Sequence, residues 1–289
     1  MRFHLTYGLS VTIFCIAISS WAEQARAQDK LAPAASAVVE DVYALRWETG
    51  LLIGGVVSTG MRRWNWGSSA TFHTSQEGWF GMNTASGGAD KLGHAMSSYA
   101  ITNILSEQLL REGRSAQQAA LASMLIADVV MTGIEFFDGY SVEYGWSNED
   151  LLMGWLGSGL AYWRQTTPGM REKLDFRLEY QPSGYKKFTP LGDYAGQKYV
   201  VALKLSGFKN LQDSPLRFLE LQTGYYTRGF SLEEQAKGLE PSRQGFVGIG
   251  VNLSELLLGR RESAESTAKR AGRLFFEHLQ LPLTATRVE

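Results

Sequence analysis

The hydrophobic pattern of the sequence changes period near Pro168, and this change separates a helix-forming part from a strand-forming part. Before Pro168, apolar residues recur at helical spacing in four segments: 47–61, 90–112, 115–137 and 151–163. After it, apolar and charged side chains alternate over 174–180, which is typical of a half-buried strand. The pattern therefore predicts an α+β fold, with a four-helix bundle over 45–168 followed by a sheet.

Residues at the segment ends support these boundaries. Gly113 ends the second predicted helix, Ser115 caps the third, and Gly139 closes it. Ser147 and Asp150 have the spacing of a capping box at the start of the fourth. The fourth helix is also rich in glycine and alanine over 154–161, so we expect another helix to approach it closely.

Three further strand candidates follow the first, and turn-forming residues separate them: 197–205, 216–227 and 244–253. Consecutive strands joined by short or medium links favour antiparallel pairing. An amphipathic helix then follows, with Ala264, Ala268, Ala271, Phe275 and His278 at helical spacing. We therefore expect a small antiparallel β-sheet and a C-terminal amphipathic helix over 172–281.

The first 27 residues have the features of a secretory signal peptide, which places the protein in the periplasm. An apolar core over 9–20 precedes Ala25-Arg26-Ala27, a small-x-small cleavage pattern, and an uncleaved membrane anchor is the alternative. The single cysteine, Cys15, lies inside that core and lacks the preceding small residues of a lipidation site. Cleavage would leave no cysteine, and we expect residues 28–44 to be an N-terminal arm.

Charge and residue counts exclude several classes of function. The net charge of −1 gives no support to nucleic-acid binding. Only His73, His94 and His278 remain after cleavage, so a His-rich zinc site is not expected and any metal would need carboxylate ligands. No phosphate-binding loop, HExxH motif or nucleophile elbow is present. We predict no cofactor and no metal.

The stretch Gly87-Gly88-Ala-Asp-Lys-Leu-Gly-His94 combines an acid, a base and an imidazole at the start of the second helix. Asp90 and His94 are four residues apart and share a helix face. An imidazole beside a carboxylate has a raised pKa and a fixed tautomer, which suits a general base. The alternative is that Asp90 caps the helix and His94 is a satisfied core histidine.

A second acidic cluster ends the third helix, where Glu135 and Asp138 lie one turn apart. Carboxylates on an otherwise apolar helix are costly unless they are paired, and Lys91 and His94 are candidate partners. Internal salt bridges that fix helix register are the alternative interpretation. Near the fourth helix, Asp150 either completes a cap or joins the same site.

These motifs, with Trp146-Ser147-Asn148-Glu149-Asp150-Leu151 and Gly157, resemble the YfiM-like family of bacterial periplasmic lipoproteins, whose function is unknown. The resemblance covers roughly residues 45–165, and the element at 192–199 resembles one in longer members. The spacing is more distantly similar to that of VanZ-like membrane proteins, which carry an Asp-Lys-x-x-His, a Glu and a Ser-x-x-Asp-Leu on successive helices. The resemblance implies export to the envelope and no particular mechanism.

Together these features predict an exported envelope protein that binds a lipid or lipid-linked envelope component in a polar pocket. Lys91, Asp138, Asp150 and Trp146 would contact the ligand. The alternatives are a hydrolase or transferase, with His94, Asp90 and Glu135 as its catalytic residues, and a purely structural role. The expected partners are membrane lipid or a membrane protein, with the bundle lying at the inner or outer membrane surface or inserted in it.

Overall fold

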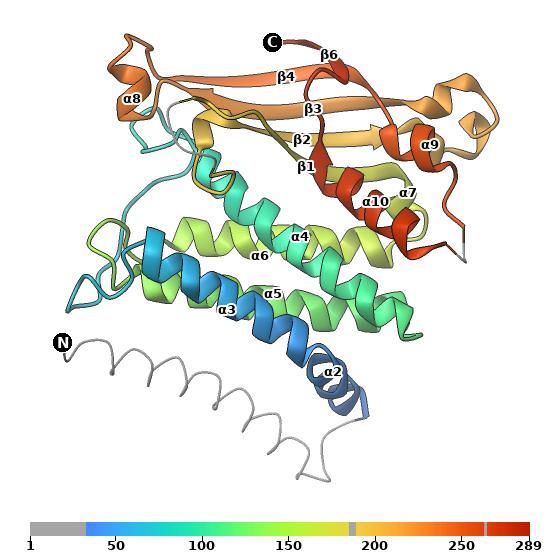
Figure 1. Cartoon of the computed structure of the whole chain (residues 1–289), viewed down its shortest axis with the longest axis horizontal. Coiled ribbons are helices and arrows are strands. Elements are labelled where there is room, and N and C mark those ends of the chain that lie inside the picture. Colours follow the sequence, from blue (N-terminus) through green and yellow to red (C-terminus); the bar gives the residue numbers. More distant parts are fainter. Residues whose placement is uncertain (1–32, 185–188, 263–264) are drawn as a thin grey trace. The chain divides into compact units, whose positions relative to one another are not determined.

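A computed structural model describes residues 33–184, 189–262 and 265–289, which form two compact units (Figure 1). The helical unit comprises residues 33–75 and 101–147, and the sheet unit comprises 76–100 and the described part of 148–289. Helix α4 (Ala89–Arg111) is shared, because the boundary between the units follows Ala100. The α+β class is confirmed, whereas the predicted signal peptide and Cys15 lie outside the described residues.

The helical unit contains α2 (Pro33–Ala44), α3 (Arg46–Arg63), the second part of α4, and α5 (Ala116–Asp138). The segment that we expected to be an N-terminal arm is thus largely helical. Apolar side chains of these helices form one buried core, which includes Leu45, Leu109, Ile126 and Met131. Among the described residues, α5 is the one helix long and apolar enough to cross a membrane, and half of its most apolar window is buried.

Local signals set the ends of α4 and α5 as the sequence predicts. The Ser115 hydroxyl accepts a hydrogen bond from Gln118 N, and the Gln118 side chain accepts one from Ser115 N, which completes a capping box. Gly113 adopts a positive φ of 86°, and Arg114 N donates to Leu109 O across the end of α4. This left-handed residue is the glycine cap that ends many helices.

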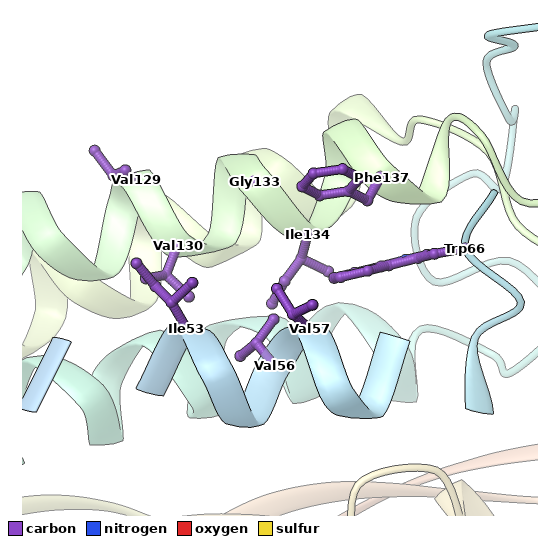
Figure 2. A pocket seen from close by; sticks show the side chains of 9 residues that line it. All are labelled: Ile53, Val56, Val57, Trp66, Val129, Val130, Gly133, Ile134 and Phe137. Carbon is purple, nitrogen blue, oxygen red and sulfur yellow. The ribbon is translucent and has the colours of Figure 1, made fainter. Parts of the chain in front are cut away.

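Helices α3 and α5 pack through branched apolar side chains (Figure 2). Ile53, Val56 and Val57 of α3 face Val130 and Ile134 of α5. A small apolar cavity of about 30 Å³ remains between them, closed at one end by aromatic rings. That volume holds at most about one water molecule, and an apolar lining gives water no hydrogen-bond partner.

The sheet unit has one six-stranded sheet in the order β5-β1-β2-β3-β4-β6 (Figure 1). Its strands are β1 (Leu174–Tyr180), β2 (Gln197–Lys204), β3 (Leu219–Arg228), β4 (Ser242–Val251), β5 (Leu279–Gln280) and β6 (Ala285–Val288). The first four match the predicted strands closely. The prediction of a purely antiparallel sheet is wrong, because β5 pairs with β1 in parallel. Strand β5 has two residues and β6 has four. Segments this short do not show an alternating pattern, so neither strand was predicted.

Helices and 3₁₀ turns accompany the sheet. The helices are α6 (Asn148–Thr166), α7 (Met170–Lys173), α8 (Leu232–Gln235), α9 (Leu253–Leu258) and α10 (Thr267–His278). The 3₁₀ turns are η1 (Tyr194–Gly196), η2 (Leu205–Gly207), η3 (Lys209–Leu211) and η4 (Pro215–Phe218). Helix α10 is the predicted amphipathic helix, although Ala264, which we placed on it, lies outside the described residues.

The two edge strands β5 and β6 follow one another in the chain, joined by residues 281–284. Such a link spans at most about 17 Å when extended. The edges of a flat six-stranded sheet lie about 24 Å apart. The sheet must therefore curl, and the segment 279–288 closes its polar side.

One sheet face packs against helices through an apolar core. Phe176 of β1 and Tyr199 of β2 contact the first part of α4, where the Tyr99 ring lies 5.7 Å from that of Phe176. Helix α6 joins this core through Ala161. The single four-helix bundle predicted over 45–168 is not confirmed, because α6 and the start of α4 belong to the sheet unit. The strands offer these helices an apolar surface that helix patterning alone does not reveal.

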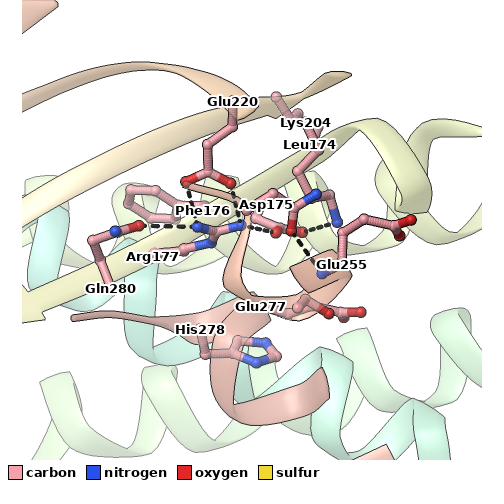
Figure 3. Close-up of polar contacts among 12 residues, drawn as sticks. Leu174, Asp175, Phe176, Arg177, Lys204, Glu220, Glu255, Glu277, His278 and Gln280 are labelled. Carbon is pink, nitrogen blue, oxygen red and sulfur yellow. Dashed lines mark hydrogen bonds and ion pairs between the residues drawn. The ribbon is translucent and has the colours of Figure 1, made fainter. Parts of the chain in front are cut away.

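The opposite face of the sheet is buried and ionic (Figure 3). Arg177 pairs with Asp175 at 2.5 Å and with Glu220 at 2.7 Å, and all three side chains are almost fully buried. The Arg177 guanidinium also donates to Gln280 on β5 at 2.9 Å. The charged positions of the alternating pattern are therefore a second buried layer, which the segment 279–288 covers.

Candidate functional site

Lys91 lies at the centre of a largely buried cluster of carboxylates in the sheet unit, which we call the Lys91 cluster: Glu77, Asp90, Lys91 and Asp150. Lys91 Nζ donates to Glu77 Oε2 at 2.6 Å, to Asp90 Oδ2 at 2.9 Å and to Asp150 Oδ2 at 3.0 Å. The lysine side chain is only 1% exposed. One ammonium group thus serves three carboxylates, so two negative charges remain if all of the carboxylates are ionised.

The loop before α4 places Asp90 and Lys91. Gly87 and Gly88 have φ angles of 65° and 88°, a region that glycine enters without strain. Ser86 Oγ donates to Asp90 Oδ1 at 2.6 Å and accepts from Asp90 N at 3.3 Å. Tyr225 on β3 donates its hydroxyl proton to Gly87 O, which attaches this loop to the sheet. Asp90 thus lies in the first turn of α4, as predicted.

Close packing of α6 against α4 brings Asp150 to the cluster. A Cβ atom built on Gly157 would lie 2.0 Å from Ala95 O, so only glycine permits this approach. One turn earlier, Ser98 Oγ donates to Gly154 O. The prediction that small residues let another helix approach α6 is confirmed, and Asp150 is positioned by that contact.

His94 lies at the edge of the cluster, with Nε2 4.0 Å from Asp150 Oδ1 and a fifth of its side chain exposed. Desolvation lowers the His94 pKa to about 4, and the Lys91 charge acts in the same direction against the opposing effects of Asp90 and Glu77. The expected rise in its pKa is therefore wrong, because burial outweighs the neighbouring carboxylates. His94 is a neutral imidazole at pH 7.

The three carboxyl groups have different pKa shifts. Desolvation raises the pKa of Glu77 to about 7, and the charge of Asp150 adds to this rise against the effect of Lys91. Burial also raises the pKa of Asp150, supported by repulsion from Asp90. Burial acts on Asp90 too, but the Lys91 charge and the Ser86 hydrogen bond outweigh it and lower its pKa. Glu77 is thus the group that titrates near neutral pH.

The Lys91 cluster has the carboxylate oxygens of a metal site, but an ammonium group lies between them. Oxygens of Glu77, Asp90 and Asp150 lie within 4.8 Å of one another, and hard cations prefer such ligands. The Lys91 ammonium, however, contacts all three at 3.0 Å or less. The ammonium therefore takes the position and supplies the charge that a bound cation would supply.

Glu77 was not identified from the sequence as a site residue, although one signal was available. It is the only acidic residue between Trp64 and Gly88, in a loop rich in Gly, Ser and Asn. A lone carboxylate in such a loop has no helix face or neighbouring charge to mark it. The contact with Lys91, fourteen positions later, depends on how the loop folds back.

Replacing Glu77 by glutamine is expected to raise stability at pH 8 and to flatten its pH dependence. A raised native pKa means that the folded state binds more protons than the unfolded state between pH 4.5 and 7, so Glu77 costs stability as pH rises through that range. We expect a gain of about 1–2 kcal/mol at pH 8 and almost none at pH 4.5. Urea unfolding at several pH values measures this, and an equal effect at both pH values would contradict it.

The other predicted site residues lie in the helical unit and have local partners there. Trp66 Nε1 donates to Asp138 Oδ1 at 2.6 Å, and Ser147 N donates to Glu135 Oε2 at 3.1 Å. Trp146 packs near Phe72, with ring centroids 6.1 Å apart. Asp90, Lys91, His94 and Asp150 are brought together within the sheet unit, whereas a site that also includes Glu135, Asp138 and Trp146 stays a prediction.

Comparison with known proteins identifies one similar family. No curated protein and no solved structure matches the chain. Residues 76–166, about a third of the chain, include the whole Lys91 cluster, His94 and Glu135. These residues match a family described as "Predicted periplasmic lipoprotein (DUF2279)", which supports an exported periplasmic protein.

Proposed function

We propose that the chain is an exported envelope protein that binds membrane lipid or a lipid-linked envelope component. The observation that carries this proposal is the exposed apolar stripe along α3. Trp47 is 72% exposed, Leu51 79% and Met61 41%. At about 100° per residue these three side chains lie on one face of the helix, which exposed glycines and Ser58 complete. Apolar surface of this kind is costly in water and favourable in a lipid interface.

Charge at the ends of α3 supports the same proposal. No charged residue lies between Glu48 and Arg62, whereas Arg46 begins the helix and Arg62 and Arg63 end it. Arginines beside an apolar helix face attract anionic lipid headgroups, each by about 1 kcal/mol near a membrane surface. Trp47 at one end and Trp64 after the other are the amphipathic aromatics common at that depth.

The Lys91 cluster provides a polar site for the headgroup or the sugar of such a ligand. It holds one buried cation, three carboxyl groups and a neutral imidazole that is partly exposed at its edge. Carboxylates and imidazole can accept hydrogen bonds from hydroxyl or ammonium groups of a ligand. In this proposal, His94 and Glu77 are the contact residues, because each is about one-fifth exposed.

Binding to vesicles tests the lipid contact. The full chain is expected to co-sediment with vesicles of phosphatidylglycerol and phosphatidylethanolamine, and Leu51→Gln is expected to weaken this partitioning about fivefold, or ~1 kcal/mol. The matched control is Leu232→Gln, because Leu232 on α8 is equally exposed, at 81%. Equal partitioning of both variants and the parent would contradict the proposal. Loss of binding in high salt would show the contribution of the arginines.

The pKa of Glu77 favours a second candidate, a hydrolase or transferase of envelope lipids. A carboxyl group with a pKa of about 7 can both donate and accept a proton at neutral pH, and neutral His94 can accept one. Mass spectrometry of envelope lipid extracts incubated with the protein tests this candidate. It requires turnover that His94→Gln and Glu77→Gln each abolish, and unchanged extracts would contradict it.

A further inference from the structure

A second cavity, distinct in chemistry from the Lys91 cluster, opens among α7, α9 and α10 in the sheet unit. Its volume is about 430 Å³, and every residue that lines it has a polar or charged side chain. The volume lies within the range of small-molecule sites, about 300–1,000 Å³, but such sites are usually lined by apolar groups. Every lining residue brings a polar group, while the carbon stems of the long side chains contribute apolar surface, and such a mixed lining suits a ligand that carries oxygen atoms on a carbon ring.

Lys204 offers this cavity an ammonium group with unused donor capacity. It is 6% exposed, and Nζ donates to Arg171 O at 3.0 Å and to Asp175 Oδ1 at 2.7 Å. An ammonium group has three N–H donors, so one remains for a ligand. Burial lowers the Lys204 pKa against the pull of Asp175, and an anionic ligand would offset that effect.

Glu255 supplies an acceptor on the wall formed by α9. The residue is 7% exposed, and its buried Oε1 accepts no hydrogen bond from the residues that the structure describes. One ion pair reaches this oxygen, from Arg217 Nε at 3.8 Å. A buried acceptor without a hydrogen bond is unfavourable, and a hydroxyl donor of a ligand would supply the missing bond.

The other charges of the lining are mostly engaged within the protein. Arg261 pairs with Glu277, which also lies 3.2 Å from Arg164 Nη2. The Arg273 guanidinium is used by Glu265, Ser254 and two backbone carbonyls. The lining has five basic and four acidic side chains, so its net charge is positive. Among the buried charged side chains of the lining, Arg273 and Glu277 are thus engaged, whereas Lys204 keeps a donor for an anion and Glu255 an acceptor for a hydroxyl.

We propose that this cavity binds an anionic sugar, whose negative group lies on Lys204 and whose hydroxyl groups donate to Glu255. The shared chemistry is a polyhydroxylated ring that carries a phosphate or a carboxylate. A neutral sugar has no anionic group for Lys204, and inorganic phosphate has no sugar hydroxyl groups for Glu255. The proposal is independent of the lipid contact of α3, because it uses different residues.

Calorimetric titration of the full chain with four probes tests the proposal: glucose 6-phosphate, glucuronate, glucose and inorganic phosphate. At least one anionic sugar is expected to bind about tenfold more tightly than glucose and than phosphate, since a hydrogen bond to a charged group contributes about that factor. A preference for glucose 6-phosphate identifies the anion as a phosphate, and a preference for glucuronate identifies a carboxylate. Equal affinities for all four probes, or no heat with either anionic sugar at about 10 mM, would overturn the proposal.

Glu255→Ala and Glu240→Ala form a matched pair for the same titration. Glu240 is exposed and does not line the cavity, so its loss should leave binding unchanged. Glu255→Ala should weaken the preferred sugar about tenfold while leaving the weak binding of inorganic phosphate unaltered. Since Glu255 Oε1 accepts no hydrogen bond and its ion pair with Arg217 is long, at 3.8 Å, its replacement should change the melting temperature little. Equal sugar affinity of the two variants would show that Glu255 does not contact the ligand.

Discussion

Replacing Lys91 by methionine is expected to destabilise the protein by about 3–5 kcal/mol at pH 8, because one buried and two partly buried carboxyl groups would lose their shared cation. Methionine keeps the length of the side chain, so the effect reports charge and hydrogen bonding rather than a cavity. Urea unfolding monitored by tryptophan fluorescence measures it. Lys209→Met is the control, since Lys209 is exposed, and a surface change of this kind usually alters stability by less than about 0.5 kcal/mol.

The pH dependence of the Lys91→Met effect provides a second measurement. Lys91 lowers the pKa of Asp90 and opposes the rise at Glu77 and Asp150, so its loss raises all three. A raised native pKa gives stability that is present at low pH and lost as pH rises. The difference in the free energy of unfolding between the parent and Lys91→Met should therefore be smaller at pH 5 than at pH 8. At pH 8 it should also be smaller when both proteins carry Glu77→Gln. A difference in unfolding free energy that does not change with pH would show that the charges of the Lys91 cluster are already screened.

The second large effect is expected at Gly157, where alanine should cost about 2–3 kcal/mol. The new methyl group would overlap Ala95 O, with a calculated separation of 2.0 Å, so α4 and α6 would have to move apart. Alanine otherwise stabilises a helix relative to glycine, by about 1 kcal/mol. The destabilisation must therefore come from packing, and urea unfolding of the variant measures it.

Gly159→Ala is the matched control on the same helix. A Cβ atom there would meet nothing within 4 Å, so the change should be neutral or stabilising by up to about 1 kcal/mol. Hydrogen exchange of α4 and α6 should then show faster opening for Gly157→Ala alone. Similar effects of the two substitutions would mean that the close approach of α4 and α6 is not maintained in solution.

Local signals in the sequence were sufficient for most of the secondary structure. Periodicity located α3, α4, α5, α6 and the four longer strands, and Ser115 and Gly113 marked helix ends through hydrogen bonds within a few residues. The pairings of β5 and β6 were not predictable, since such short segments become strands only when a longer neighbour offers an edge. The division of the helices into two units also depends on surfaces presented by β1 and β2.

The candidate site was also predicted only in part from the sequence. Spacing placed Asp90 and His94 on one face of a helix, and of the two interpretations left open for Asp150, a helix cap or a member of the cluster, the contact with Lys91 is present. The direction of the His94 pKa shift was wrong because burial, which depends on the complete fold, outweighed the carboxylate beside it. Glu77 was not predicted because a loop has no periodicity from which the direction of a side chain can be inferred. Contacts within a helix were thus accessible from sequence, whereas burial and loop contacts were not.

The pairing of β5 and β6 has a consequence for how the protein folds after export. Strands β1 and β4, the outer members of the four-stranded core, are translocated before the segment 279–288 that covers them. Until that segment arrives, both edges expose unpaired backbone groups, and exposed edges invite pairing between molecules. The sheet can therefore be completed only after the segment 279–288 has been translocated, and a variant that lacks this segment would keep both edges open to pairing between molecules.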